Sequence, residues 1–267
     1  MLNIKGNNKG KPAPPGEAGR RVIVALDVSS VNEAIALVDR LLEFTDSFKV
    51  GMELFYAAGP AVIDKIRQRG GRVFLDLKLH DIPNTVGAAA ASLSRLGVWM
   101  FNVHASGGLD MMKRAAQSVS GAVSEAALGP VVGLGMERPR VLAVTVLTSI
   151  DDRSLRGELG VARSAAEQVV VLAGLAKEAG LDGVVASPRE AQAIREACGP
   201  EFIIVTPGVR PAWAEAGDQR RVASPAEAFR AGADYIVVGR PVTQAPDPAG
   251  AMKRIIEEVS GIIDAGE

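Results

Sequence analysis

The run 75–79 alternates three leucines with two charged residues, Asp76 and Lys78. Residues two apart in a β-strand point to the same face, so both charges face one side and the leucines face the other. Burying an unpaired carboxylate or ammonium is costly, so the two groups are expected to neutralise each other. A coupled acid–base pair in a partly dry pocket has perturbed titrations, which suits proton-transfer chemistry.

Three further charged residues stand at or near the ends of apolar runs. Asp27 ends the run 22–27, Lys49 lies within 47–51, and Asp81 follows the leucine-rich run. Together with Asp76 and Lys78 they form a set in which acids and bases compensate one another. We interpret the set as a catalytic array, and a structural ion-pair network is the alternative interpretation.

Short apolar runs alternate with stretches at helical spacing along most of the chain. The runs read as strands buried on both faces are 22–27, 47–51, 72–77, 98–103, 140–146, 183–186, 202–205 and 235–239. The stretches read as helices are 31–44, 61–68, 84–96, 108–123, 162–178, 189–197, 225–231 and 248–263. This alternation predicts the α/β class and a (β/α)8 TIM barrel, a single domain over residues 21–267.

Residues 1–20 are rich in Gly, Pro, Asn and Lys, and we expect a flexible N-terminal leader there. The stretch 124–139, rich in Gly and Pro, is expected to be an irregular excursion before the fifth strand. A doubly wound open sheet is the alternative fold. The first strand–helix junction, after Asp27, lacks the glycine-rich fingerprint of a dinucleotide-binding sheet.

The barrel places the chemistry at the carboxyl ends of the strands, where its active sites lie. The seventh strand leads into Thr206-Pro207-Gly208-Val209-Arg210, and the eighth into Val238-Gly239-Arg240-Pro241. Glycines allow backbone N–H groups to approach an anion, and an arginine can bind two phosphate oxygens at once. Loops after these two strands commonly bind phosphate in this fold, so we predict a phosphate site there.

Composition excludes several classes of function. The 267 residues carry 30 Lys and Arg against 31 Asp and Glu, a formal charge of −1, which disfavours binding to a nucleic-acid polymer. No apolar stretch has the length of a membrane-spanning helix. The single cysteine, Cys198, excludes an intramolecular disulfide and a cysteine-cluster metal site. The two histidines, His80 and His104, leave little material for a histidine-rich metal site. We therefore expect a soluble, cytoplasmic protein.

Several of these segments, in this order, resemble the orotidine 5′-phosphate decarboxylase family. The most specific is the long run 75–85, and the resemblance extends over residues ~21–260. The other matching segments are 25–27, 49–51, 103–108, 147–149, 206–210 and 238–241. The resemblance implies a (β/α)8 barrel that is a homodimer and needs no metal or organic cofactor. It implies conversion of the nucleotide orotidine 5′-monophosphate to uridine 5′-monophosphate and CO2, the last step of de novo UMP synthesis.

The resemblance also implies roles for the charged array. Lys78 would donate the proton to C6 of the pyrimidine, and Asp76 would lie beside the substrate carboxylate. Asp27 and Lys49 would bind the ribose hydroxyls.

Asp81 and Thr85 would reach the site from the partner subunit. Further implied substrate contacts are those of Thr148 with the pyrimidine edge, Pro207 with the base pocket, Gln219 with base and phosphate, and Gly239 and Arg240 with the phosphate.

Three alternatives stay open. A metal-dependent sugar-phosphate lyase or decarboxylase shares the spacing of Asp76, Lys78 and Asp81, although Thr148 and the run 79–85 argue against it. The second is a sugar-phosphate isomerase or epimerase, which would release no CO2. The third is a non-catalytic, nucleotide-binding barrel, which would not need the intact array of charges.

Overall fold

A closed barrel of eight parallel strands forms the centre of the molecule in a computed structural model that describes residues 15–126, 137–214 and 223–264. Each strand pairs with its neighbour in chain order, and β8 closes on β1. The strands are β1 (Val22–Ala25), β2 (Ser47–Gly51), β3 (Arg72–Leu79), β4 (Met100–His104), β5 (Arg140–Val144), β6 (Gly183–Val185), β7 (Ile203–Thr206) and β8 (Tyr235–Val238). The predicted (β/α)8 barrel is thus confirmed.

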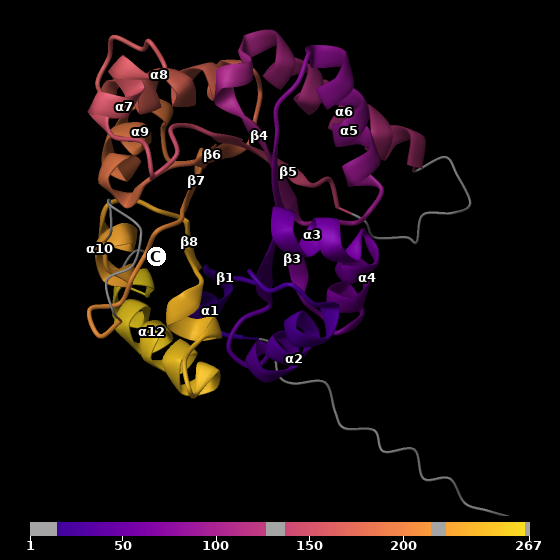
Figure 1. Cartoon of the computed structure of the whole chain (residues 1–267), viewed down its shortest axis with the longest axis vertical. Helices are drawn as coiled ribbons and strands as arrows, with labels where there is room; N and C mark the ends of the chain where they lie inside the picture. Colours follow the sequence, from indigo (N-terminus) through magenta and orange to yellow (C-terminus); the bar gives the residue numbers. More distant parts are fainter. Residues whose placement is uncertain (1–14, 127–136, 215–222, 265–267) are drawn as a thin grey trace, which may run out of the picture.

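The helices surround the strands on the outside of the barrel (Figure 1). The eight that follow the strand–helix alternation are α2 (Val31–Leu41), α4 (Ala61–Gln68), α5 (Pro83–Ser94), α6 (Leu109–Ala126), α8 (Ala165–Glu178), α9 (Ala191–Cys198), α10 (Pro225–Arg230) and α12 (Pro248–Ile263). Two of them begin with a capping box, in which a serine and the glutamate three residues on satisfy backbone N–H groups reciprocally. These boxes are Ser164 with Glu167 and Ser224 with Glu227.

Alternation along each strand divides the core in two. In β1, Val22 and Val24 pack toward the helices, whereas Ile23 and Ala25 point into the barrel. The barrel interior is filled by side chains from all parts of the ring, among them Phe74, Met100, Leu142, Val185, Val205 and Val237. This apolar layer closes the barrel below its carboxyl end, so polar side chains further along the strands stand on a dry floor.

Four short helices lie outside the predicted set: α1 (Glu17–Arg20), α3 (Met52–Ala58), α7 (Asp152–Gly157) and α11 (Arg240–Thr243). Helix α1 lies within residues 1–20, expected to be a flexible leader, and its Ala18 and Gly19 are buried. The packed chain therefore begins before residue 21, because Ala18 is buried and Gly19 lies so close to the backbone carbonyl of Phe44 that a side chain would not fit.

Helix α6 extends to Ala126, into the predicted excursion, of which residues 127–136 lie outside the described residues. In the described part of the chain, no helix has the length and apolar character needed to cross a lipid bilayer.

Candidate active site

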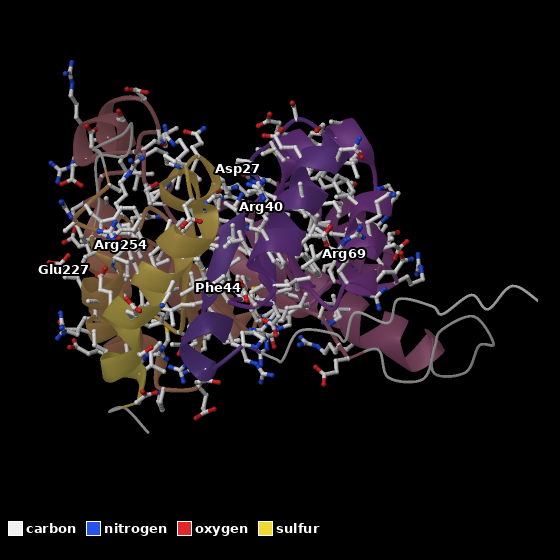
Figure 2. The ribbon with its side chains drawn as sticks, turned by 90° about the horizontal axis from the view of Figure 1, so that it is seen from below. Asp27, Arg40, Phe44, Arg69, Glu227 and Arg254 are labelled. Carbon is white, nitrogen blue, oxygen red and sulfur yellow. The ribbon has the colours of Figure 1, made fainter. Side chains whose placement is uncertain are left out.

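Two aspartates and two lysines alternate in a row at the carboxyl end of the barrel. The ammonium of Lys78 lies 2.7 Å from Oδ1 of Asp76, and Lys49 Nζ lies 3.3 Å from Oδ2 of the same carboxylate. Lys49 Nζ also donates to Oδ1 of Asp27 at 3.0 Å. These side chains come from β2, β3 and the residues after β1. In Figure 2 the label of Asp27 lies above that of Phe44, which precedes β2. Four members of the predicted array, all except Asp81, thus form one connected network.

The network holds its inner members charged. Burial alone would raise the pKa of Asp76, but the charges of Lys49 and Lys78 and hydrogen bonds from Lys78 and Asn102 outweigh it and lower that pKa. Burial likewise favours a lower pKa for Lys49, whereas Asp76 and Asp27 outweigh it and raise that pKa. A carboxylate and an ammonium are therefore both stabilised in a site that excludes much of the solvent.

Lys78 shares the face of Asp76, as the alternation predicts, and it lies in an irregular part of β3. The register shifts between Leu75 and Leu79, so residues 76–78 of β3 lie opposite the single residue Asn102 of β4. Lys78 has φ of 53°, in the left-handed region that non-glycine residues rarely adopt. This bulge directs the ammonium back over the mouth of the barrel.

Asn102 is a site residue that the sequence interpretation did not assign. Its side chain is fully buried, its Oδ1 accepts the backbone N–H of Lys78 at 2.8 Å, and its Nδ2 donates to Asp76 at 2.7 Å. Asn102 points into the barrel because it stands two residues after Met100 of the interior layer. The available signal was an amide side chain inside an otherwise apolar strand.

Gly51 is a second unassigned contributor. A Cβ at this position would lie 3.1 Å from Lys49 Nζ and 3.4 Å from Oδ1 of Asp27. The absence of a side chain therefore leaves room for the ion pair between Lys49 and Asp27.

Two adjoining cavities meet at Lys49 and Asp76. The polar one, about 230 Å³, also contains Asp27, Pro207 and Gly208 and is bordered by Arg210, Gly239 and Arg240. The apolar one, about 180 Å³, is lined by Phe74, Val144, Val185 and Val237 of the barrel interior, with Lys78, Thr148 and Pro207 at its rim. Gly208 has φ of 79°, so the turn after β7 favours glycine at this position. An elongated ligand with an anionic end and a flat apolar end matches the shape of this pair.

The structure brings most of the predicted site residues to these cavities. They are Asp27, Lys49, Asp76, Lys78, Thr148, Pro207, Gly239 and Arg240. Asp81 and Thr85 do not join them: both are exposed, and the carboxylate of Asp81 accepts the backbone N–H of Ile82 at 2.6 Å. Gln219 lies outside the described residues.

A pair of histidines supports the edge of the site. The rings of His80 and His104 stack with centroids 5.3 Å apart, and Nδ1 of His104 lies 2.7 Å from the hydroxyl of Ser106. Burial lowers the pKa of His104, and the neighbouring His80 and Lys78 lower it further. Among the described residues, no group of three or more His, Cys, Asp or Glu side chains is arranged to hold a metal ion.

The chain is similar to proteins of one known family over most of its length. Residues 20–255 match the sequence model of the Orotidine 5′-phosphate decarboxylase / HUMPS family. A relative from Moorella thermoacetica, named orotidine 5′-phosphate decarboxylase, is 58% identical over 239 residues, covering 90% of this chain and 92% of its own. One of the same name from Syntrophomonas wolfei is 50% identical, covering 91% of this chain and 99% of its own. The crystal structure of orotidine 5′-phosphate decarboxylase from Lactobacillus acidophilus superposes with a TM-score of 0.76 at 42% identity, covering 90% of this chain and 98% of that one.

Proposed function

The chain belongs to the orotidine 5′-phosphate decarboxylase / HUMPS family, and on that premise we propose that it converts orotidine 5′-monophosphate to uridine 5′-monophosphate and CO2. It is a carboxy-lyase of pyrimidine nucleotide synthesis. The main observation in support of this reaction is the position of the charged array. Its Lys49 and Asp76 lie where the polar and apolar cavities meet. The pyrimidine would occupy the apolar cavity and the ribose phosphate the polar one.

Lys78 is the proton donor in this proposal. The bond between C6 and the carboxylate carbon breaks, CO2 leaves, and the electron pair remains on C6. A fixed ammonium beside C6 stabilises this developing negative charge and then transfers a proton to it. The resulting neutral amine regains its proton from water.

Asp76 and Lys49 set the conditions for that step. The ion pair of 2.7 Å between Asp76 and Lys78 fixes the ammonium, and the lowered pKa of Asp76 keeps the carboxylate ionised beside the leaving group. Asp27 and Lys49 border the polar cavity, where they would bind the ribose hydroxyls. Pro207 and Thr148 would contact the base.

The phosphate would bind at the loops after β7 and β8. Arg240 and Gly239 border the polar cavity there. Because the phosphate is remote from the bond that breaks, its binding energy serves to position the pyrimidine against Lys78. Gln219 is proposed to bridge base and phosphate.

The test is the ultraviolet absorbance change when orotidine 5′-monophosphate is added to EDTA-treated protein. Wild type is expected to form uridine 5′-monophosphate, and Lys78→Ala to lose at least roughly 10³-fold in kcat, because the proton donor and the main electrostatic stabiliser are removed together. Lys253→Ala is the matched control, since Lys253 is an exposed lysine paired with Glu257 on α12. Conversion by Lys78→Ala at the wild-type rate would refute the proton-donor role. No conversion by folded wild type would refute the decarboxylase.

We further propose that the active enzyme is a homodimer in which Asp81 and Thr85 complete the partner's site. Residues 81–85 are all exposed, and Ile82 is 67% exposed. Two more apolar side chains, Met52 and Tyr56, are 45% and 73% exposed on α3, which follows the neighbouring strand. Apolar exposure on helix α3 and on the loop after β3 is typical of a surface that a second copy covers.

Subunit complementation tests the shared site. Lys78→Ala and Asp81→Ala should each be nearly inactive alone, whereas a mixture after subunit exchange should regain about a quarter of wild-type activity, because half of the dimers contain one intact site. Sedimentation of wild type should give the mass of two chains. A monomeric, active wild type, or a mixture no more active than its parts, would refute the shared site.

A further inference from the structure

A second cavity lies at the opposite end of the barrel from the active site. It is about 440 Å³ in volume and is formed by the turns that lead into β3, β4 and β5 and by the last turn of α4. Arg72 begins β3 at this end and Lys78 lies near the other, so the two sites are roughly 20 Å apart along the strand. The cavity therefore shares no lining residue with either part of the active site.

Its charged lining is strongly basic. Arg67, Arg72, Arg138 and Arg140 line it, against the single acid Glu137. The whole chain has a formal charge of −1, so this concentration of guanidinium groups departs from the average. Residues 127–136, which directly precede Glu137 in the chain, contain no Asp or Glu that could neutralise the arginines.

Two of the four arginines already have strong partners. Arg138 donates to both oxygens of Asp182 at 2.8 and 2.9 Å. Arg72 pairs with Asp46 at 3.0 Å and lies 3.8 Å from the ring centroid of Trp99. These contacts hold both guanidinium groups in place at the cavity.

The other two retain unused hydrogen-bonding capacity. Nη1 of Arg140 donates to the hydroxyl of Tyr235 at 3.1 Å, which is a neutral partner, and no described acid forms an ion pair with Arg140. Arg67 has one described acid nearby, Asp64, at 3.6 Å. A guanidinium carries five N–H donors, so both groups keep donors for a further anion.

Glycine backbone holds Arg67 against the cavity. A Cβ at Gly97 would lie 2.5 Å from Cζ of Arg67, so the guanidinium rests directly on the backbone of this residue. Gly97 has φ of 66°, a conformation that itself favours glycine. Gly70 and Gly71 line the same cavity without side chains that would fill it. The donors are thus positioned before any ligand arrives.

We propose that this cavity, which we call the basic pocket, binds an oligophosphate: inorganic pyrophosphate or triphosphate, or the phosphate chain of a nucleoside triphosphate. Guanidinium groups suit phosphate oxygens in geometry and charge. Four arginines around a cavity of about 440 Å³ suit an anion with several phosphoryl groups. One face of Trp99 is occupied by Arg72, so we assign recognition to the phosphates.

Trp99 provides a local reporter for the test. The chain has two tryptophans, and Trp213→Phe leaves Trp99 as the sole indole. Arg240→Ala in the same background removes the arginine of the proposed catalytic phosphate site. Titration with pyrophosphate, triphosphate or a nucleoside triphosphate should change Trp99 fluorescence saturably, and calorimetry should give one site per chain. Tighter binding of the nucleoside triphosphate would identify a nucleotide as the ligand, and equal binding an inorganic oligophosphate.

Arg67→Gln and Arg69→Gln form a matched pair of variants. Arg69, labelled in Figure 2, belongs to the same turn but pairs with Asp39 at 2.8 Å and lies outside the basic pocket. Arg67→Gln should weaken oligophosphate binding about tenfold, the effect of one charge-assisted contact, and Arg69→Gln less than about twofold. Absence of saturable binding, or equal effects of the two substitutions, would overturn the proposal. Because the readout is binding, it is independent of decarboxylase activity.

Discussion

The side-chain oxygen of Asn102 accepts the backbone N–H of Lys78 at 2.8 Å, and this contact joins β4 to the irregular part of β3. The same side chain donates to Asp76 at 2.7 Å. A backbone N–H must face an oxygen and a carboxylate must face an N–H group, so the two bonds fix the orientation of the amide. Asn102 thereby stabilises the left-handed backbone of Lys78, which by itself costs about 1–3 kcal/mol.

Asn102→Ala is expected to lower kcat roughly 10–100-fold with a smaller effect on KM, because Lys78 and Asp76 lose their common support while the phosphate contacts persist. The free energy of unfolding should fall by about 1–3 kcal/mol, since a buried carboxylate and a backbone N–H lose a partner. Steady-state kinetics and urea denaturation measure both quantities. Unchanged kcat in a folded variant would show that Asn102 does not position Lys78.

Gly51→Ala tests the space that the array requires. The added Cβ would crowd Lys49 Nζ and Oδ1 of Asp27, whereas φ of −88° and ψ of −178° suit alanine. We expect kcat/KM to fall about tenfold or more because the ion pair shifts, with a stability change within about 1 kcal/mol. Gly174→Ala, which adds a Cβ in open space on α8, should leave kinetics unchanged. Equal kcat/KM values of Gly51→Ala and Gly174→Ala would contradict the prediction that the ion pair needs the space at Gly51.

His104 should make the fold sensitive to mild acid. Its pKa is lowered in the folded chain, so below its ordinary value of 6.5 the unfolded chain binds the proton more readily. The free energy of unfolding should therefore decrease as pH falls from about 7 toward 5. His104→Gln should reduce this slope and leave the slope above pH 7 unchanged. Denaturation curves between pH 5 and 8 provide the measurement. If the free energy of unfolding of wild type and of His104→Gln depended on pH in the same way, His104 would not be the cause of the acid sensitivity.

Arg240→Ala should reduce kcat/KM for orotidine 5′-monophosphate roughly 10–100-fold, the effect of losing a charge-assisted contact with phosphate. Orotidine, which lacks the phosphate, should react equally slowly with the variant and with wild type. The comparison isolates the interaction between the side chain and the phosphate. A similar loss with both substrates would assign Arg240 a structural role instead. Arg153→Ala, on the exposed face of α7, is the control.

The barrel fold could be predicted from the sequence because each of its strands and helices has its own local pattern. Each strand is a short apolar run and each following helix has its own periodicity and, at Ser224 and Glu227, its own cap. The prediction that Asp76 faces the barrel and Leu75 the helices rests on the same two-residue period and is confirmed, since Leu75 packs in the outer core. Some strand ends differ from the prediction: β3 continues to Leu79 rather than ending at residue 77, and β4 begins at Met100 rather than at residue 98.

The sequence by itself determined the eight strand–helix units and the residue types at the strand ends, because periodicity and side-chain chemistry are properties of neighbouring residues. Only the tertiary structure decided how Asn102 meets Lys78, why Gly51 must lack a side chain, and where four arginines converge beneath the barrel. Each of these depends on the register between strands or on turns far apart in the chain. The two-residue period correctly places Lys78 on the face of Asp76, with Leu77 and Leu79 toward the helices, whereas the bulge opposite β4 and the left-handed backbone of Lys78 arise from strand pairing. Closure of the barrel creates such contacts, and no local pattern contains them.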